Sequence, residues 1–436
     1  MTTKDFLAEP VDPTTAARLA AKGLRMNVLD LANAEASAAW SEAANRGFHG
    51  GKVTPERHAE WSEANAARRN TGVWDDSSPS AEPVGTSNSW ISRLAVPGHR
   101  TIDAWAISTV TVASTHHKRG IARALLEAEL AAAAKHVPMA MLTVSESSLY
   151  QRYGFAPAAF AADYEFDSRR VTWSGPRPDG RVEFITLEKF AEHLAEMHER
   201  LVPTTPGQID IWPLRVAQIA GTAKSEEDRA KRLRAIRYVD AGGAVQGIAL
   251  YKVSGGDDDF VTHQLDVEHL VAETPDADAA LWRYLLEVPL VAKVKAGHRR
   301  VEEPVHWMIT DWRAVKVSVW EHQYLRILDV ETAFAARDYL ADGTIVFDVD
   351  DPYGYASGRW QLTVEGGKGS AKEAAGAGSV PTLTLGVPEL SAIYLGGVKA
   401  RTLAAAGRIS ESAPGAAALA DGLLRSEVTP FLSIWY

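Results

Sequence analysis

The chain has 436 residues, 46% of them hydrophobic and 23% charged, as in ordinary globular proteins, and this length predicts two to four domains. The absence of cysteine excludes disulfide scaffolds, cysteine zinc sites, iron–sulfur clusters and cysteine nucleophiles, and it fits a reducing cytoplasm. The net charge of −10 argues against a nucleic-acid partner and agrees better with a cationic ligand, although acidic residues that serve only solubility are the simpler explanation.

No stretch supplies the ~20 uninterrupted apolar residues that a membrane-spanning helix needs, so we expect no membrane partner. The first ten residues show no basic segment followed by an apolar core, which predicts no secretory signal. We therefore expect a cytoplasmic protein, and export by a route without a signal peptide stays open.

The first third of the chain is expected to end in a βαβ-like unit. In chain order the pattern predicts a mainly helical segment, two strands joined by a PGHR turn, a long amphipathic helix and a buried strand, at residues 13–69, 89–96, 105–112, 121–135 and 139–144. Within the helical segment, Thr54 is the expected N-cap of a helix that begins at Pro55.

The middle of the chain is expected to form a second α/β unit. Its predicted strands are 171–178, 183–187, 237–240, 244–253, 261–270 and 305–309, and its predicted helices are 190–200 and 276–287. The sequence GGDDD at 255–259 is typical of a hairpin turn.

The last third is expected to contain a further small sheet with helices. The predicted strands are 325–328, 344–349, 358–365 and 382–385. The predicted helices begin after Asp329, at Pro388 and near Ala416, and the first of them is expected to end near Leu340. The Gly- and Ala-rich segment 366–379 is expected to be a mobile loop, and the apolar end 431–436 is strand-like.

The segment 110–122, VTVASTHHKRGIA, runs from a strand through a basic turn into the long helix. Free backbone N–H groups at such a helix start bind phosphate or pyrophosphate, and Gly120 lets the anion approach the backbone. His117, Lys118 and Arg119 add charge-assisted hydrogen bonds. The spacing matches neither a P-loop nor a dinucleotide fingerprint, and a solvated basic turn is the alternative.

This segment resembles the coenzyme A loop of the GNAT superfamily of N-acetyltransferases, [Q/R]-x-x-G-x-[G/A] after a V-x-V strand. His117 stands in place of the usual Arg or Gln, which weakens one phosphate contact and leaves the backbone amides untouched. The resemblance implies acetyl-CoA as cosubstrate, bound by Val110, Thr111, Val112, His117, Lys118, Arg119, Gly120, Ile121, Ala122 and Ser145.

Three further segments, 145–155, 324–336 and 394–409, resemble the Eis (enhanced intracellular survival) family in the same order along the chain. The resemblance implies an α/β (α+β) fold with two GNAT-type acetyltransferase domains in tandem and a sterol-carrier-protein-like domain. The expected limits are 1–164 for the catalytic domain, 165–309 for a second domain without an active site, and 310–436. It also implies a homohexamer that acetylates primary amines of aminoglycosides, polyamines or lysine side chains.

The same resemblance implies two catalytic groups. Tyr150 would be the general acid that protonates the departing thiolate. The terminal carboxylate of Tyr436 would accept a proton from the amine, because the C-terminus of the family folds into the active site. The alternatives are an ordinary buried aromatic at Tyr150 and, for the tail, a strand that completes the third domain. Trp435 stands where an acidic residue would help to hold a polycation.

Aromatic residues of the N-terminal helices, Trp40 and Phe48 together with Trp61, are candidates for the substrate pocket, since aromatic faces suit a cation. Core packing is the competing interpretation. The sequence HLAEMH at 193–198 does not match a zinc motif, and we expect no metal. Two other function classes stay open, a lipid-binding protein that uses the third domain and an interaction protein with a decayed acetyltransferase fold.

Overall fold

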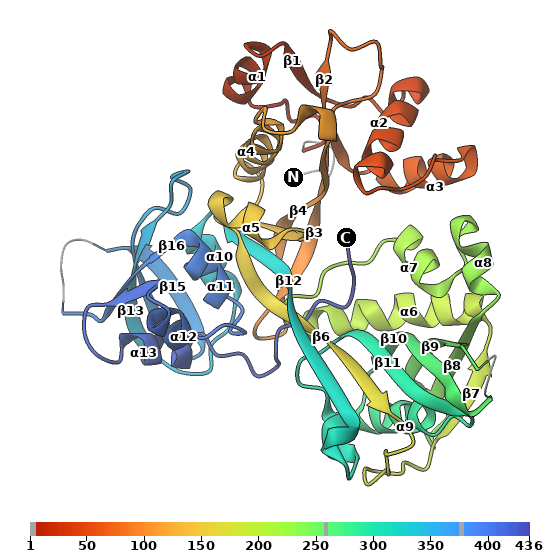
Figure 1. The fold of residues 1–436 in the computed structure, drawn as a ribbon. Helices are drawn as coiled ribbons and strands as arrows, with labels where there is room; N and C mark the ends of the chain where they lie inside the picture. The colour runs from red at the N-terminus through yellow and green to blue at the C-terminus, as the bar shows by residue number, and fades with distance from the viewer. Residues whose placement is uncertain (1–5, 257–259, 375–378) are drawn as a thin grey trace.

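The computed structural model describes residues 6–256, 260–374 and 379–436. They form three units that meet at the middle of the molecule, where two long strands run side by side (Figure 1). The first unit consists of α1 (Pro13–Ala20), β1 (Leu24–Val28), α2 (Ala34–Gly47), α3 (Pro55–Asn65), β2 (Arg69–Asp75), β3 (Gly85–Val96), β4 (Arg100–Val112), α4 (Ile121–Ala133), β5 (Met139–Thr143), α5 (Ser147–Tyr150) and β6 (Ala156–Asp167).

The second unit repeats the alternation of strands and helices. It consists of β7 (Arg181–Ile185), α6 (Leu187–Leu201), α7 (Pro213–Ala220), α8 (Glu227–Ala230), β8 (Leu233–Val239), β9 (Val245–Ser254), β10 (His263–Ala272), α9 (Pro275–Leu286), β11 (Val291–Arg299) and β12 (Val315–Ile327).

The third unit has its own five-stranded sheet, in the order β15-β14-β13-β16-β17. Its elements are α10 (Val330–Ala336), β13 (Gly343–Asp350), β14 (Gly358–Glu365), β15 (Lys368–Glu373), β16 (Thr382–Gly386), α11 (Val387–Ile393), α12 (Ala400–Ala405), β17 (Ile409–Glu411) and α13 (Ala416–Leu423). Aromatic rings fill the space between this sheet and its helices, since Phe334 lies 5.6 Å from both Phe347 and Tyr394, and all three are buried.

One mixed sheet of twelve strands joins the first two units, in the order β1-β2-β3-β4-β5-β12-β6-β11-β10-β9-β8-β7. Two neighbouring pairs are parallel, β4 with β5 and β10 with β11, and each is connected through a helix, α4 or α9. The remaining pairs are antiparallel. Each unit therefore contains one strand–helix–strand crossover at a comparable place in its half of the sheet.

Strands β6 and β12 cross the boundary between the first two units. β12 pairs with β6 from Val315 opposite Phe166 to Leu325 opposite Ala156, and its C-terminal part also pairs with β5. The expected limits at 164/165 and 309/310 stay predictions, but β6 spans the first of them and β12 continues the large sheet beyond the second.

Helix starts agree with their local sequences. The Thr54 hydroxyl accepts a hydrogen bond from the amide of Arg57 and caps α3, as predicted, and Asp329 caps α10 in the same way through the amide of Thr332. Helix α10 ends at Ala336, which is earlier than the expected end near Leu340.

Several strands differ from the sequence-based expectation. The helical segment 13–69 is interrupted by β1, and β6, β11 and most of β12 were not predicted. Segment 305–309 lies mostly in a 3₁₀ helix, Pro304–Met308, because the fixed φ of Pro304 suits the first turn of a helix. Segment 171–178 contributes only the bridge between Trp173 and Ile309. Part of the expected loop 366–379 is strand β15, while 375–378 and residues 257–259 of the GGDDD turn lie outside the described residues.

Candidate active site

A cavity opens where the parallel strands β4 and β5 part. Their pairing runs only from Trp105 opposite Ala140 to Ile107 opposite Leu142, and β4 continues to Val112 beyond it. The solvent-open space between the two strands measures about 460 Å³. It is lined by Phe48, Ile107, Ser108, Thr109, Val110, Leu142, Thr143, Ser145, Tyr150, Trp435 and Tyr436.

A β-bulge shapes the wall that β4 gives to this cavity. The register between β3 and β4 shifts between Thr86 and Asn88, and Thr109 has a left-handed backbone with φ of 54°. The Thr86 hydroxyl holds the bulge by donating to the Thr109 carbonyl oxygen at 2.9 Å. The bulge redirects the backbone of Ser108–Val110 at the point where the strands separate.

Tyr150 ends the short helix α5 and lines the cavity. Its side chain is buried, with the ring edge-on to Phe155 at 6.4 Å. Burial raises the pKa of the Tyr150 phenol to about 12, and the nearby charge of Glu146 adds to this shift. The hydroxyl is therefore protonated at neutral pH, which suits a proton donor.

The chain ends in the same cavity. The Thr143 hydroxyl donates to a terminal carboxylate oxygen of Tyr436 at 2.7 Å, and the Tyr436 phenol donates to Gln323 Oε1 at 3.2 Å. The Tyr436 ring lies edge-on to Trp90, and burial raises its phenol pKa well above the ordinary value. In Figure 1 the C-terminus lies near the centre of the molecule, between β3 and α7.

The last six residues form no strand. The five-stranded sheet of the third unit is built from β13 to β17 alone among the described residues, and 431–436 run instead through the interior between the units. The alternative interpretation of the tail, a strand that completes the third domain, is therefore wrong.

A half-buried cation lies against Trp90, the ring that contacts Tyr436. The Arg68 guanidinium is stacked between Trp90 at 3.6 Å and Trp212 at 4.3 Å, and its Nη1 donates to Asn88 Oδ1. Burial lowers the pKa of Arg68 to about 9, so it stays charged at neutral pH. Trp212 comes from the second unit, so residues of two units enclose this guanidinium.

The predicted phosphate loop joins β4 to α4. Gly120 is the residue before the first turn of α4 and has a left-handed backbone, φ 84° and ψ 14°. An added Cβ there would come within 3.3 Å of the Lys22 ammonium, which donates to the Arg119 carbonyl oxygen at 2.9 Å. Lys22 thus brings a positive charge to the turn from the segment before β1.

Two of the basic side chains of this loop are engaged in local contacts. Arg119 pairs with Asp75 at 3.1 Å and also donates to the Lys22 carbonyl oxygen, and His117 Nε2 lies 3.2 Å from the Val112 carbonyl oxygen. The pKa of Asp75 is held well below its usual range, first by the Ser77 hydroxyl and then by His116 and Arg119. Lys118 is exposed.

Of the three predicted pocket aromatics, Phe48 alone lines the cavity. Phe48, at the end of α2, lines the cavity and is 56% exposed. Trp40 is fully buried, donates from its indole to the Thr71 carbonyl oxygen and stacks on Trp61 at 5.1 Å. Trp40 is therefore a core residue, and its assignment to the substrate pocket is corrected.

Sequence reasoning missed Ser108, Thr109 and Thr143 in the lining, and Lys22 at the loop. The local sequence does not mark these residues as part of a site, because the opening between β4 and β5 forms only when the two strands are assembled. Lys22 lies almost a hundred positions before the loop that it contacts.

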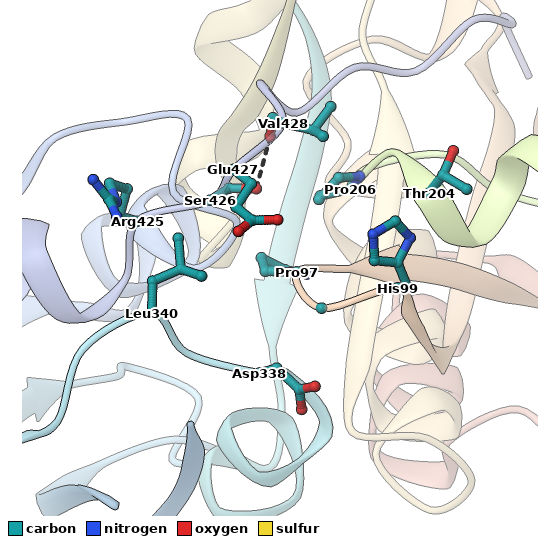
Figure 2. Close-up of a pocket in the computed structure, with 11 residues that line it drawn as sticks. Pro97, His99, Thr204, Pro206, Asp338, Leu340, Arg425, Ser426, Glu427 and Val428 are labelled. Atoms are coloured by element: carbon teal, nitrogen blue, oxygen red, sulfur yellow. Dashed lines mark hydrogen bonds between the residues drawn. The ribbon is translucent and has the colours of Figure 1, made fainter. Parts of the chain in front are cut away.

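A second cavity, of about 380 Å³, lies where the three units meet (Figure 2). The turn between β3 and β4 contributes Pro97 and His99, and the segment 425–428 contributes the facing wall, in which the Ser426 hydroxyl donates to the Val428 carbonyl oxygen. None of the predicted site residues lines it.

Among the described residues, no group of three or more His, Asp or Glu side chains is arranged to hold a metal ion. Every helix in the described ranges is too short or too polar to cross a bilayer.

Three family models match the chain. Two are acetyltransferase (GNAT) domains, at residues 29–158 and 211–327, and the third is a sterol carrier protein domain at residues 330–433.

Relatives extend over nearly the whole chain. An uncharacterized N-acetyltransferase of Streptomyces avermitilis is 34% identical over 93% of this chain and 97% of its own length. The N-acetyltransferase Eis of Mycobacterium bovis is 27% identical over 82% of this chain and 87% of its own length. Among solved structures, Eis1 of Mycobacterium abscessus superposes with a TM-score of 0.79 at 26% identity, covering 95% of this chain and 100% of Eis1.

These matches confirm the predicted fold class, with two acetyltransferase domains in tandem and a sterol-carrier-type domain after them. The chain belongs to the Eis family of N-acetyltransferases within the GNAT superfamily.

Proposed function

We propose that this N-acetyltransferase moves the acetyl group of acetyl-CoA directly to a primary amine, with Tyr150 as general acid and the Tyr436 carboxylate as general base. The observation that carries the proposal is that one cavity is lined by both groups and by the parted strands β4 and β5. The amine nitrogen attacks the thioester carbonyl carbon and the C–S bond breaks. The Tyr150 hydroxyl gives its proton to the sulfur, and the carboxylate takes one from the nitrogen.

Backbone and small side chains would hold acetyl-CoA. The opening between β4 and β5, beside Val110, Thr111, Val112 and Ser145, would admit the extended arm of the coenzyme. The β4 amides would stabilise the developing oxyanion. The pyrophosphate would lie on the turn from His117 through Lys118, Gly120 and Ile121 to Ala122, with the ammonium of Lys22 beside it. Arg119 would contribute its backbone amide, because its guanidinium is paired with Asp75.

The amine side of the cavity offers Phe48, Trp435 and the terminal carboxylate. Within the lining, this carboxylate is the sole acidic group. We propose cationic primary amines as substrates, namely aminoglycosides, polyamines or lysine side chains, whose further charges would lie outside the cavity. A cytoplasmic homohexamer is proposed from the family resemblance.

The test is to mix the protein with acetyl-CoA and a panel of amines and to follow free thiol. Release of coenzyme A that depends on the amine, with the acetylated amine seen by mass spectrometry, is the expected result. Tight binding of a fatty ligand without thiol release would instead favour the lipid-binding alternative, which the aromatic filling of the third unit disfavours.

The role of the terminus has a separate test. Amidation of Tyr436 by chemical ligation replaces the carboxylate by a neutral group of similar size. We expect a large fall in kcat/KM and an almost unchanged Kd for acetyl-CoA, because the coenzyme loop lies elsewhere. A terminus that works equally well when amidated would remove Tyr436 from the catalytic set.

A further inference from the structure

The C-terminal tail, residues 431–436, is hydrogen-bonded at alternate residues to two histidines. His298 Nε2 lies 2.8 Å from the Leu432 carbonyl oxygen, and His322 Nε2 lies 2.9 Å from the Ile434 carbonyl oxygen. Since a carbonyl oxygen only accepts, each Nε2 carries the hydrogen and donates it. His298 belongs to β11 and His322 to β12.

Ser433, the residue between these two carbonyls, is held by another partner. Gln208 Oε1 accepts from the Ser433 amide at 3.1 Å and from the Ser433 hydroxyl at 3.0 Å. One step earlier, the Phe431 amide donates to the Pro206 carbonyl oxygen at 2.8 Å. From 431 to 434 every residue of the tail is therefore bonded to a fixed part of the sheet or to the segment after α6.

Aromatic packing holds the two imidazoles in the positions from which they donate to the tail. Their rings meet edge to face at 4.2 Å, and the Trp435 indole covers His322 at 4.7 Å while it stacks on Trp320. Burial lowers the pKa of His298 well below its ordinary value and that of His322 to about 4, so both rings are neutral at physiological pH.

We propose that His298, His322 and Gln208 are positioning residues that fix the terminal carboxylate in the cavity. Gln208 and His298 come from the second unit, so the acetyltransferase-like domain for which no reaction centre is expected would serve to aim the base of the first domain. The inference rests on the proposed role of that carboxylate.

A free chain end samples many conformations, and a catalytic group must be held within about 0.5 Å of its working position. The carbonyls of Leu432 and Ile434 are two and four residues before the reacting group, and the next fixed point is the carboxylate itself on Thr143. Loss of the earlier contacts leaves the end of the tail held by the bonds of Tyr436 to Thr143 and Gln323 and by the ring contacts of the last two residues.

The experiment replaces both donors in the full-length protein, His298→Leu with His322→Leu, and compares it with the double change to Gln, whose amide N–H reaches about as far as Nε2. His306→Leu, which removes a histidine of the same unit that stacks on Trp312, is the matched control. The readouts are release of Tyr436 and Trp435 by carboxypeptidase A, followed by mass spectrometry, the kcat/KM for an amine, and acetyl-CoA affinity by calorimetry.

We expect the Leu pair to lose Tyr436 and Trp435 at least about tenfold faster and to lose about 10²-fold in kcat/KM, the usual scale for a misplaced catalytic group. Acetyl-CoA affinity stays within about twofold, and the Gln pair and the control resemble the native protein. If the Leu pair does not fold, Gln208→Ala takes its place, because it removes two tail contacts without touching the histidines. We expect it to speed carboxypeptidase release and to lower kcat/KM in the same way.

Unchanged carboxypeptidase release in both the Leu pair and Gln208→Ala would overturn the inference, whatever the activity. Faster release with native turnover would keep the positioning role and would instead remove the terminal carboxylate from the proposed mechanism. The two proposals therefore fail in different measurements.

Discussion

At the scale of single residues, the cavity brings together two tyrosines that are far apart in the sequence, and each contributes a different chemical group. Tyr150 presents a phenol whose pKa of about 12 keeps its proton in place, and Tyr436 presents its terminal carboxylate on Thr143. A donor and an acceptor at one cavity allow one proton to be delivered and another to be collected.

Tyr150→Phe removes only the hydroxyl, so the fold should change little. If the phenol is the acid, kcat falls by about 10²–10⁴-fold in the thiol-release assay, and the loss shrinks with a thioester whose thiolate leaves more easily. Tyr153→Phe, a change at a neighbouring buried tyrosine outside the cavity lining, should leave kcat nearly native. Equal turnover of the two variants would assign the proton to water or another group.

Trp435→Glu adds a second carboxylate where the cavity has only the terminal one. For a partly exposed charge pair of about 1 kcal/mol, the KM for a polyamine such as spermine falls roughly fivefold, while that of a monoamine changes little. The preference weakens in high salt because ions screen the pair. Trp435→Gln controls for the lost packing on Trp320, and the same KM change in both variants would contradict an electrostatic cause.

Tyr150 could be placed in the site because it lies in a segment that resembles a family motif, and Tyr436 because the resemblance implies a C-terminus that enters the active site. Phe48 was a candidate because aromatic faces suit a cation. Trp40 and Phe48 belong to the same helical region, and only the docking of α2 decides that Trp40 packs inward and Phe48 faces the cavity. Asp75, the ion-pair partner of Arg119, could likewise not be predicted from the local sequence, because it lies on another strand.

At the scale of elements, the turn between β4 and α4 is the feature that the sequence describes best. A strand, a glycine with a left-handed backbone and a helix of 13 residues follow one another as the motif predicts. The parting of β4 from β5 was not predictable, since it depends on a bulge at Thr109 and on β12 pairing with the far side of β5.

Gly120→Glu should abolish acetyl-CoA binding. Glutamate would have to adopt the left-handed backbone of Gly120, at a cost of about 1–2 kcal/mol. Its carboxylate would also place a negative charge against the pyrophosphate. Gly243→Glu is the matched control, with φ of 89° and open space around an added Cβ, on the turn between β8 and β9. A calorimetric titration in which both variants bind acetyl-CoA alike would remove this loop from the site.

Two of the strands that were not predicted, β6 and β12, lack the alternation of buried and exposed residues. β6 is rich in alanine and buried on both faces over much of its length, so it lacks the alternation that marks a half-buried strand. β12 has exposed apolar residues in its first half and buried polar ones, His322, Gln323 and Arg326, in its second. β12 forms a strand because it pairs with β5 and β6 on its two sides.

At the scale of the whole molecule, a buried ion pair joins the third unit to β12 of the second. Arg326 on β12 donates from Nη2 to both carboxylate oxygens of Asp351 at 2.7 Å, and neither side chain is exposed. Arg326 Nε also donates to the Tyr153 carbonyl oxygen, close to the end of α5. The third unit is thereby fixed to the segment that carries Tyr150.

Asp351→Ala should lower the free energy of unfolding by about 3–5 kcal/mol, because it leaves the Arg326 charge buried without its partner. Asp348→Ala breaks the partly exposed pair with Arg359 in the same unit and should cost at most about 1 kcal/mol. Urea denaturation of both variants measures the difference. Similar midpoints would mean that water or a rearranged side chain replaces the buried partner.

The placement of β12 between β5 and β6 has a consequence for how the protein is made. β5 and β6 leave the ribosome early, but the strand that pairs with both follows β5 by about 180 residues. At 5–20 residues per second, roughly 10–40 s pass before it emerges. During that interval β5 exposes the edge that β12 later covers, and β6 lacks this neighbour too. Open strand edges are sites of aggregation. A fragment that ends at residue 164 keeps those edges open for good.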